Sequence, residues 1–295
     1  MTGQRAAAEP YATRFETEVT SIDGRRVWLE RSHFFGASGG QPADRGTIGD
    51  IAVTDVQYAD GEQVHVLAEE PSFRTGHRVL CSVDWSFRMY CMRAHTASHI
   101  LAGAARRLLE EPTCVGLDIG AQTASVDLET SATLDDETLI ELDELVNRVV
   151  WESRPVSWDD MPLSRARERD GITVDAELDA AAVEKGRVRV VTIEDENDNR
   201  NRNRLSNMNG SADPWDVTAC GGTHVRNTRE VGPVTVLGRS RPTDGVIRIE
   251  FAVGPQAIDH RTAEKRAALA ASAALDVELE DVTDELERVR AARSR

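Results

Sequence analysis

Two histidines near the middle of the chain have the residue type and spacing of metal ligands. His95 and His99 lie four residues apart within residues 89–109, a run that is rich in Ala, Leu, Met and Arg and lacks proline. This composition predicts a helix. Four residues make about one helical turn, so both imidazoles are expected on one face. Taken by itself, such a pair more often belongs to an ordinary helix surface or core.

A second pair of metal-binding side chains occurs far downstream. Cys220 and His224 are again four residues apart, but Gly221-Gly222 between them favours a tight loop over a helix. Zn²⁺ accepts nitrogen and sulfur donors in tetrahedral geometry, so three imidazoles and one thiolate suit it. The two pairs together predict a zinc site formed by His95, His99, Cys220 and His224.

The composition restricts the environment of the protein. Asp and Glu total 51 against 35 Lys and Arg, a net charge of -16, and only Lys185 and Lys265 are lysines. Such a surface is typical of a halophilic protein, because high salt screens its self-repulsion; an ordinary acidic cytoplasmic protein is the alternative. The four cysteines are widely spaced, and no run resembles a signal peptide or membrane span. We therefore expect a reducing cytoplasm, no disulfide framework and no membrane partner.

The N-terminal third has the pattern of a small β structure. Across residues 13–85, short alternating runs are separated by turn signals such as Asp23-Gly24 and Asp60-Gly61, which predicts a β-barrel or curled sheet. Residues 34–46 between these runs are rich in glycine. The glycines either let the backbone approach a ligand or form a tight turn, and the turn is the favoured interpretation.

The rest of the chain alternates predicted helices and strands. After the His helix, residues 115–128 resemble a pair of strands, 135–151 an amphipathic helix, and 188–193, 234–237 and 246–251 further strands. We therefore predict an α+β fold with three parts. These are an N-terminal β-barrel-like domain (1–86), an α/β domain with an antiparallel sheet and the zinc site (87–255), and a C-terminal helix (256–295).

The C-terminal segment also has the pattern of a coiled-coil seam. Apolar residues alternate spacings of four and three at Leu275, Leu279, Val282, Leu286 and Val289. The seam is short, so two arrangements stay open: the helix forms a homodimer, or it packs back on the body of the chain.

Several motifs occur in an order that resembles a known family. They are Gly39-Gly40-Gln41-Pro42 with Asp44-Arg45-Gly46, Val83-Asp84-Trp85 with Arg88, the His95 and His99 motif, Cys220-Gly221-Gly222-Thr223-His224 with Gly232, and Arg248-Ile249-Glu250-Phe251. Over roughly residues 12–254 the chain resembles AlaX-type alanyl-tRNA editing proteins and the editing domain of alanyl-tRNA synthetase. Nothing in it resembles the aminoacylation module of the synthetase. The resemblance implies a free-standing, zinc-dependent trans-editing hydrolase that deacylates Ser-tRNA(Ala), or Gly-tRNA(Ala).

Zinc suits the implied reaction, because it acidifies a bound water and polarises the ester carbonyl. Four protein ligands, however, are typical of structural zinc, whereas catalytic zinc usually keeps an open position. Three alternatives remain: one ligand lies outside the shell, the ion expands to five-coordinate with substrate, or the zinc is only structural.

Selectivity for serine requires a polar partner for its hydroxyl, which alanine would leave unpaired. The family tends to carry a glutamine near the ester on the strand after the His helix, where this chain has Asp118. A carboxylate there would act as a base or bind the substrate ammonium group. We therefore predict Asp118 and Thr96 as catalytic, and expect substrate contacts from Gly39, Gly40, Gln41, Thr113 and Thr223.

Binding of tRNA to so acidic a protein calls for a local basic surface. Residues 194–213 are strongly polar and include Arg200, Arg202 and Arg204, which we predict as the tRNA contact. Two other functions stay open. One is a zinc-stabilised tRNA-binding module without hydrolytic activity, and the other is a zinc hydrolase of a small ester or amide.

Overall fold

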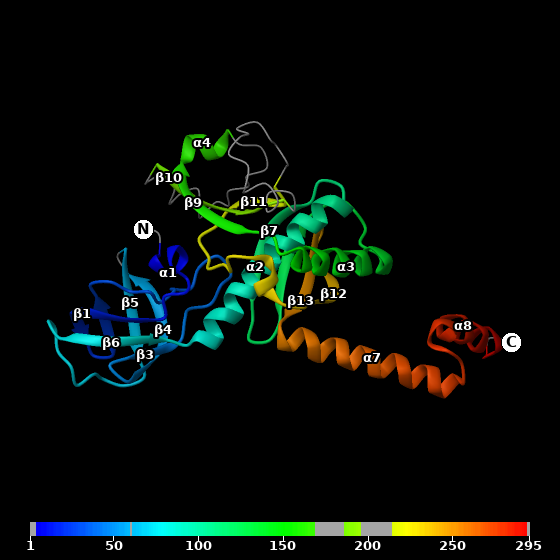
Figure 1. Cartoon of the computed structure of the whole chain (residues 1–295), viewed down its shortest axis with the longest axis horizontal. Coiled ribbons are helices and arrows are strands. Elements are labelled where there is room, and N and C mark those ends of the chain that lie inside the picture. Colours follow the sequence, from blue (N-terminus) through cyan, green and yellow to red (C-terminus); the bar gives the residue numbers. More distant parts are fainter. Residues whose placement is uncertain (1–3, 60, 169–185, 196–213, 294–295) are drawn as a thin grey trace.

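The computed structural model describes residues 4–59, 61–168, 186–195 and 214–293. It contains a closed barrel, two antiparallel sheets and several helices (Figure 1), as the predicted α+β class requires. The predicted tRNA-contact residues Arg200, Arg202 and Arg204 lie outside the described residues.

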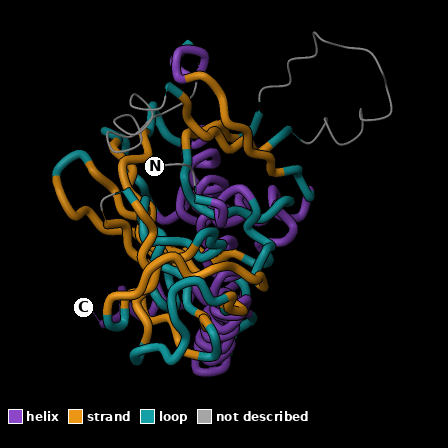
Figure 2. Tube along the Cα trace, turned by 90° about the vertical axis from the view of Figure 1, so that its left-hand side faces the viewer, coloured by secondary structure: helices purple, strands orange, loops and turns teal. Residues whose placement is uncertain are grey.

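The N-terminal part is a closed antiparallel barrel, which confirms the predicted β structure. Its strands are β1 (Arg14–Asp23), β2 (Arg26–Leu29), β3 (Gly46–Ile48), β4 (Ile51–Ala59), β5 (Glu62–Leu67) and β6 (Arg78–Val83), in the order β1-β2-β5-β4-β3-β6. Alternate residues of β6 are buried, so apolar side chains such as Val79 and Cys81 fill the interior. Seen from the barrel side, the barrel strands lie in front of helices of the second part (Figure 2).

A long helix, α2 (Trp85–Leu108), leads from the barrel into the second part of the chain (Figure 1). Its N-cap is Asp84, whose carboxylate accepts a hydrogen bond from Phe87 N at 3.1 Å. Fifteen residues of α2 are buried, from Arg88 to Ala105. The helix that carries both histidines is therefore surrounded by protein over most of its length.

A four-stranded antiparallel sheet packs against α2. Its order is β12 (Val234–Thr243), β13 (Val246–Val253), β8 (Ala124–Glu129) and β7 (Thr113–Ile119), and α3 (Asp136–Glu152) packs beside α2. One core contains Ile100 and Leu101 of α2, Val126 of β8, Val146 of α3 and Phe251 of β13. Since β7 is an edge strand, one row of its backbone groups is open to another segment.

A smaller sheet leads to the loop that carries Cys220 and His224, the second pair of predicted metal ligands. Its strands are β11 (Asp216–Ala219), β10 (Arg187–Ile193) and β9 (Val156–Pro162), and α4 (Leu163–Arg167) follows β9. The Cys220 loop leaves β11 and continues to the short helix η1 (Thr228–Val231), which contacts α2. This sheet thus delivers Cys220 and His224 to the side of α2.

The N-terminal segment joins several of these parts. It contains α1 (Arg5–Ala8), and Gln4 exchanges hydrogen bonds with the backbone of Gly36 at 2.8 and 3.1 Å. The Arg189 guanidinium donates to Ala7 O at 2.9 Å. The segment therefore connects the Gly-rich loop of the barrel with the small sheet β11-β10-β9, which leads into the loop containing Cys220 and His224.

A buried ion pair fixes the barrel against α2. Asp44, in the Gly-rich loop, and Arg88, in α2, are fully or almost fully buried, and Arg88 Nε lies 3.0 Å from Asp44 Oδ1. The guanidinium also donates to Pro10 O and His33 O, both at 2.7 Å. Four chain segments therefore meet at one guanidinium group, which sets the position of the barrel relative to the His helix.

The predicted C-terminal helix is present but not continuous, so the seam prediction is wrong. The chain forms α7 (Pro255–Leu275), the short helix η2 (Leu279–Asp281) and α8 (Val282–Arg293). Asp276 ends α7 in the left-handed conformation with φ 53°. Leu275 is therefore separated from the other predicted seam residues, which lie on η2 and α8, and the five residues do not form one continuous helical seam.

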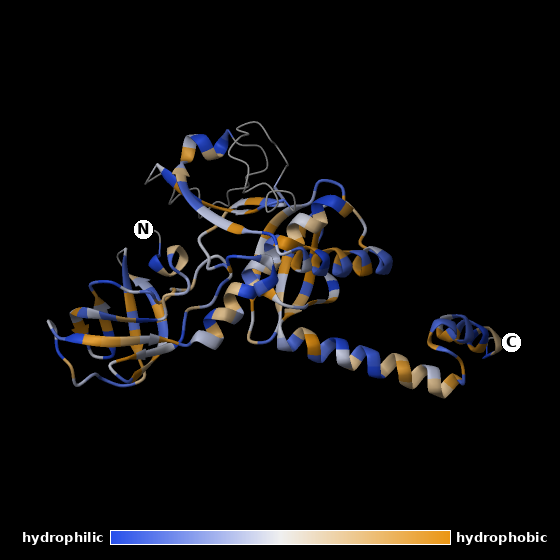
Figure 3. Cartoon of the chain, viewed as in Figure 1, coloured by the Kyte–Doolittle hydropathy of each residue, from blue (hydrophilic) through white to orange (hydrophobic). Residues whose placement is uncertain are grey.

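Most of α7 extends away from the body of the chain, and α8 lies at its far end (Figure 1). Apolar residues mark the distal part of α7 (Figure 3), where Leu269 is half exposed. The homodimer and the domain boundaries at residues 86 and 255 stay predictions. Within the described ranges, no helix is both long and apolar enough to cross a membrane.

Candidate functional site

Helix α2 places His95 and His99 on one face, as the spacing predicts. The two imidazoles have ring centroids 5.7 Å apart, and the residues are only 4% and 7% exposed. Both rings therefore lie in an environment from which most water is excluded, where a bound ion or reacting group would be shielded.

The loop after β11 brings the second pair to the first. Cys220 Sγ lies 3.2 Å from His95 Nε2 and 3.2 Å from His224 Nε2. One ligand atom from each of His95, His99, Cys220 and His224 lies within 4.8 Å of the others. The structure thus places the four predicted ligands in one buried cluster, which could hold a metal ion.

Gly222 allows this close approach. A Cβ atom at Gly222 would lie 2.0 Å from Cε1 of His95, a distance that side chains cannot adopt. The glycine between Cys220 and His224 is therefore required so that the loop can pass against the His95 ring.

The three imidazoles are held so that their Nε2 atoms face the cluster. Each Nδ1 atom has a hydrogen-bond partner outside the four donors. These partners are Gln41 Oε1, 3.0 Å from His95, Asp216 Oδ2, 2.7 Å from His99, and Thr96 Oγ1, 3.2 Å from His224. Metal-binding histidines are oriented in this way by outer partners, which also fix the tautomer. The arrangement fits a transition metal with nitrogen and sulfur ligands.

The charge state of the thiol also fits a metal site. Burial raises the pKa of Cys220, but the charges of His95 and His224 and hydrogen bonds from both rings outweigh it and hold the pKa well below its ordinary value. The thiolate is the form that binds zinc. The donor set is therefore suitable for Zn²⁺, which prefers such nitrogen and sulfur ligands.

Asp216 was not singled out from the sequence. It is 2% exposed, forms an ion pair with Arg106 and accepts a hydrogen bond from Thr218 Oγ1 at 3.0 Å. Burial raises the pKa of Asp216, but its hydrogen bond and charge interaction with His99, together with Arg106, lower it below the ordinary value. The only signal in the sequence is a carboxylate four residues before Cys220.

Replacing Asp216 by alanine should weaken metal binding without unfolding the chain. Loss of an outer partner of a ligating histidine typically lowers metal affinity by about 10- to 100-fold. Zinc affinity, measured by competition with a chromophoric chelator, checks this for Asp216→Ala. The exposed Asp160 on β9 of the same sheet supplies the control Asp160→Ala. Equal affinity of both variants would contradict the role of Asp216.

The Gly-rich loop forms a tight turn that docks on β7, as the favoured interpretation predicts. Ser38 and Gln41 exchange backbone hydrogen bonds of 3.1 and 3.0 Å, and Gly39 and Gly40 have φ of 55° and 75°. Two positive φ values are typical of a type I′ turn. A Cβ atom at Gly40 would lie 1.8 Å from Leu117 O. The loop therefore approaches the edge of β7 so closely that only glycine fits.

Gln41 and Thr223, both predicted to bind substrate, are buried and contact one another. Gln41 Oε1 accepts from Thr223 N at 3.0 Å, and Gln41 Nε2 donates to Thr223 Oγ1 at 2.9 Å. Because Gln41 Oε1 also lies 3.0 Å from His95 Nδ1, Gln41 links the Gly-rich loop to both metal motifs. Its role in substrate binding stays a prediction.

The other predicted residues lie in different environments. Thr96 is fully buried and accepts a hydrogen bond from Val225 N at 3.2 Å. Asp118 is exposed, and its neighbours Leu117 and Ile119 pack on the core beneath α2, so its side chain projects from the opposite face of the sheet. Thr113 is exposed at the other end of β7. Catalytic roles for Thr96 and Asp118 and a substrate contact for Thr113 stay predictions.

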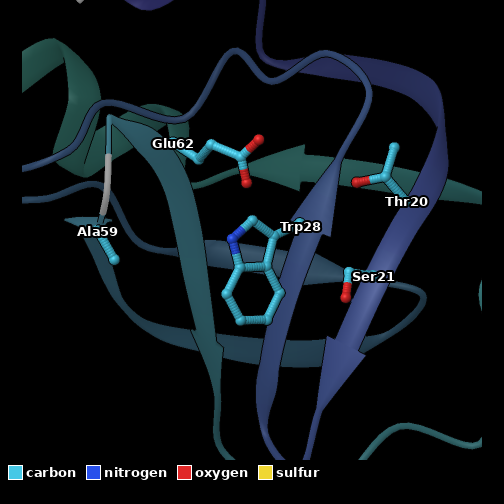
Figure 4. A pocket seen from close by; sticks show the side chains of 5 residues that line it. All are labelled: Thr20, Ser21, Trp28, Ala59 and Glu62. Atoms are coloured by element: carbon cyan, nitrogen blue, oxygen red, sulfur yellow. The ribbon is translucent and has the colours of Figure 1, made fainter.

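The barrel carries a separate open pocket of about 440 Å³. It is lined by Thr20, Ser21, Trp28, Ala59 and Glu62 (Figure 4). The Trp28 ring lies among the other four side chains. The pocket shares no residue with the His and Cys cluster, so it is distinct from the candidate metal centre.

Comparison with known proteins agrees with the motifs. Residues 188–250, which include Cys220 and His224, match the family model of the threonyl and alanyl tRNA synthetase second additional domain. Alanine–tRNA ligases of Pyrococcus abyssi and Pyrococcus furiosus are 34% and 32% identical to the chain over 285 residues, 95% of its length. That of Thermococcus kodakarensis is 32% identical over 256 residues, 85% of the chain.

The chain spans 29% of the length of the two Pyrococcus ligases and 26% of the Thermococcus ligase. The match therefore concerns one segment of these proteins, and within the chain it includes both metal motifs. The family-model match and this similarity along the chain support an alanyl-tRNA editing domain that is similar to the AlaX type.

Proposed function

We propose that the chain is an aminoacyl-tRNA deacylase that removes serine, and also glycine, wrongly esterified to tRNA(Ala). The observation that carries this proposal is the buried cluster in which three imidazoles, each fixed by an outer partner, converge with a thiolate. The similarity to alanine–tRNA ligases supports tRNA(Ala) as the substrate class.

In this proposal His95, His99, Cys220 and His224 hold Zn²⁺. When bound, zinc would polarise the ester carbonyl and make a water molecule more acidic. Gln41, Asp216 and Thr96 keep the rings in position, so that the site needs little rearrangement during the reaction. Hydrolysis adds one water across the ester, which releases the free amino acid and restores the hydroxyl at the tRNA 3′ end.

The roles of individual substrate contacts belong to the same proposal. Gly39, Gly40, Gln41, Thr113 and Thr223 are proposed to line the path of the substrate, with Thr96 and Asp118 as catalytic groups. A hydroxyl partner for serine would favour it over alanine, since a buried polar group left unpaired by alanine costs free energy.

Three further features extend the proposal beyond the metal centre. The hydrolase acts in trans, on mischarged tRNA that another enzyme has released, and does so in the cytoplasm. Arg200, Arg202 and Arg204 contact the tRNA, and the C-terminal helices mediate a homodimer. Each of these features is independent of the proposed metal chemistry. If one of them is disproved, the proposed zinc-dependent hydrolysis still stands.

The deacylation experiment tests the proposal directly. Zinc-loaded protein in molar potassium chloride is expected to release serine rapidly from Ser-tRNA(Ala) and to leave Ala-tRNA(Ala) charged. His95→Ala and Cys220→Ala should reduce serine release to the uncatalysed rate, because each removes a ligand from a four-donor site. The thiol of Cys114 lies outside the cluster, so Cys114→Ala serves as the matched control.

The outcomes separate the alternatives. If no serine is released although zinc is bound and the fold is intact, the tRNA-binding module becomes the better explanation. If the protein cleaves small esters and tRNA does not compete, it is a small-molecule zinc hydrolase. If Cys220→Ala unfolds the chain, zinc is structural.

A second variant tests the proposed catalytic carboxylate. A general base typically contributes about 100-fold or more to a rate, so Asp118→Asn should slow serine release by a similar factor if Asp118 is the base. Full activity of this variant would remove Asp118 from the mechanism, in agreement with its exposed position on the far face of the sheet.

A further inference from the structure

Tyr11, Trp85 and Arg226 form a continuous stack beside the metal loop. The Tyr11 and Trp85 rings have centroids 5.8 Å apart at an interplanar angle of 45°, and Arg226 Cζ lies 4.6 Å from the centroid of Tyr11. Trp85 is 41% exposed and Arg226 is also exposed. An aromatic and guanidinium surface is thus open to solvent.

Hydrogen bonds fix the position of Tyr11 within the stack. Tyr11 Oη donates to Glu230 Oε2 at 2.6 Å and accepts from Arg226 N at 3.1 Å. Arg93 of α2 donates from Nε to Glu230 O at 2.8 Å. Burial, followed by the hydrogen bond to Glu230, raises the pKa of Tyr11 to about 12, so the hydroxyl keeps its proton. The Tyr11 ring is therefore fixed before any partner binds.

The stack is close to the metal centre in the fold. Arg226 follows the candidate metal ligand His224 by two positions. Trp85 lies in the first turn of α2, ten residues before His95, which is about 15 Å along a helix axis. The stack is thus close to the candidate metal centre along both the Cys220–His224 loop and helix α2.

The local charge also differs from that of the whole chain. Arg226 is exposed beside the Tyr11 ring, and Arg93 donates to the backbone carbonyl of Glu230, whose carboxylate accepts from Tyr11 Oη, whereas the chain carries a net charge of -16. Within the described part of the chain, no carboxylate forms an ion pair with Arg226. A phosphate backbone would thus find a local positive group on an otherwise acidic protein.

We propose that this stack binds unpaired nucleotides at the 3′ end of an RNA substrate, a proposal that rests on the proposed function. Unpaired bases stack on aromatic rings and on guanidinium planes, whereas a duplex keeps its bases paired and stacked. Trp85 has no capping role that would explain its presence, because Asp84 caps α2. The Trp85 face binds a base, and Arg226 binds the adjacent phosphate.

The test uses uncharged RNA and therefore does not depend on hydrolysis. Two hairpin RNAs are compared, one with a single-stranded 3′ end and one blunt, with affinity measured by fluorescence anisotropy. Wild-type protein is expected to prefer the RNA with the single-stranded end. Trp85→Ala should weaken binding of that RNA by about 5- to 150-fold, the loss expected for one stacked base, and leave the blunt RNA unchanged.

Three further variants complete the design. Trp85→Phe should retain most of the preference, because a phenyl ring still stacks. Arg226→Ala should weaken binding of the RNA with the single-stranded end more than binding of the blunt RNA and lower the salt dependence of the former, since it removes a phosphate contact. Trp151 on α3 is 84% exposed and has no ring contact with Tyr11 or Trp85 among the described residues, so Trp151→Ala is the matched control.

Equal affinity of wild-type protein for the two RNAs would overturn the proposal, as would a loss in Trp85→Ala that is the same for both RNAs. Circular dichroism and thermal unfolding of each variant establish that the fold is intact. Serine release measured in parallel separates the two proposals. If the protein deacylates Ser-tRNA(Ala) but shows no preference for the single-stranded end, only the proposed nucleotide binding by the stack is refuted. If it shows the preference but no deacylation, only the proposed deacylase function is refuted.

Discussion

Replacing Arg88 by methionine is expected to lower the free energy of unfolding by about 3–5 kcal/mol, the usual cost of leaving one partner of a buried ion pair alone. Asp44 would keep its backbone hydrogen bond from Phe35 N, 2.6 Å long, but lose every contact with the guanidinium. Burial already raises the pKa of Asp44 although Arg88 counteracts it. Pro10 O and His33 O would also lose their donors.

Urea unfolding monitored by circular dichroism measures this loss. The control is the double variant Arg88→Met with Asp44→Asn, in which the amide can still accept from Phe35 N but no charge is buried. If the buried charge causes the loss, the double variant should be more stable than Arg88→Met alone, by roughly 0.5–3 kcal/mol for residues in direct contact. A double variant no more stable than the single one would assign the loss to the missing hydrogen bonds and packing.

Acid should destabilise the barrel through His65. This residue is fully buried, its Nδ1 lies 3.2 Å from Val27 O, and its Nε2 lies 2.7 Å from Ser32 Oγ. Burial lowers the pKa of His65 from 6.5 to about 4, although the Val27 hydrogen bond opposes this. In the unfolded chain the imidazole takes up a proton at a higher pH than in the folded one. The contribution of His65 to stability is therefore complete above pH 6.5 and is lost as the pH falls toward 4.

The expected loss is about 3 kcal/mol across that interval. Comparing wild-type protein with His65→Gln isolates it, because glutamine does not titrate while the carboxylates and other histidines remain. The difference in unfolding free energy between the two proteins should increase from pH 4 to 6.5 and stay constant above pH 7. A difference that is independent of pH would show that the imidazole is not the titrating group.

Local sequence patterns predicted the strands and helices well in segments where a single periodicity, that of a strand or that of a helix, dominates. Alternating residues and turn signals indicated the barrel, and the proline-free run around His95 indicated α2, which extends from Trp85 to Leu108. Each depends on contacts between near neighbours in sequence. The same reasoning failed beyond Leu275, because Asp276 adopts a left-handed conformation that interrupts the helix. Heptad spacing describes where apolar residues recur. It does not reveal where a helix ends when the end is not marked by glycine or proline.

The sequence could suggest the four candidate metal ligands that the structure brings together, because each pair is local. One helical turn brings His95 beside His99, and the Gly221-Gly222 turn brings Cys220 beside His224. Only the tertiary structure decided how the two pairs meet and what holds them. Asp216 and Gln41 reach His99 and His95 from segments 117 and 54 residues away. Such contacts depend on how strands and loops pack, which no spacing within one segment determines.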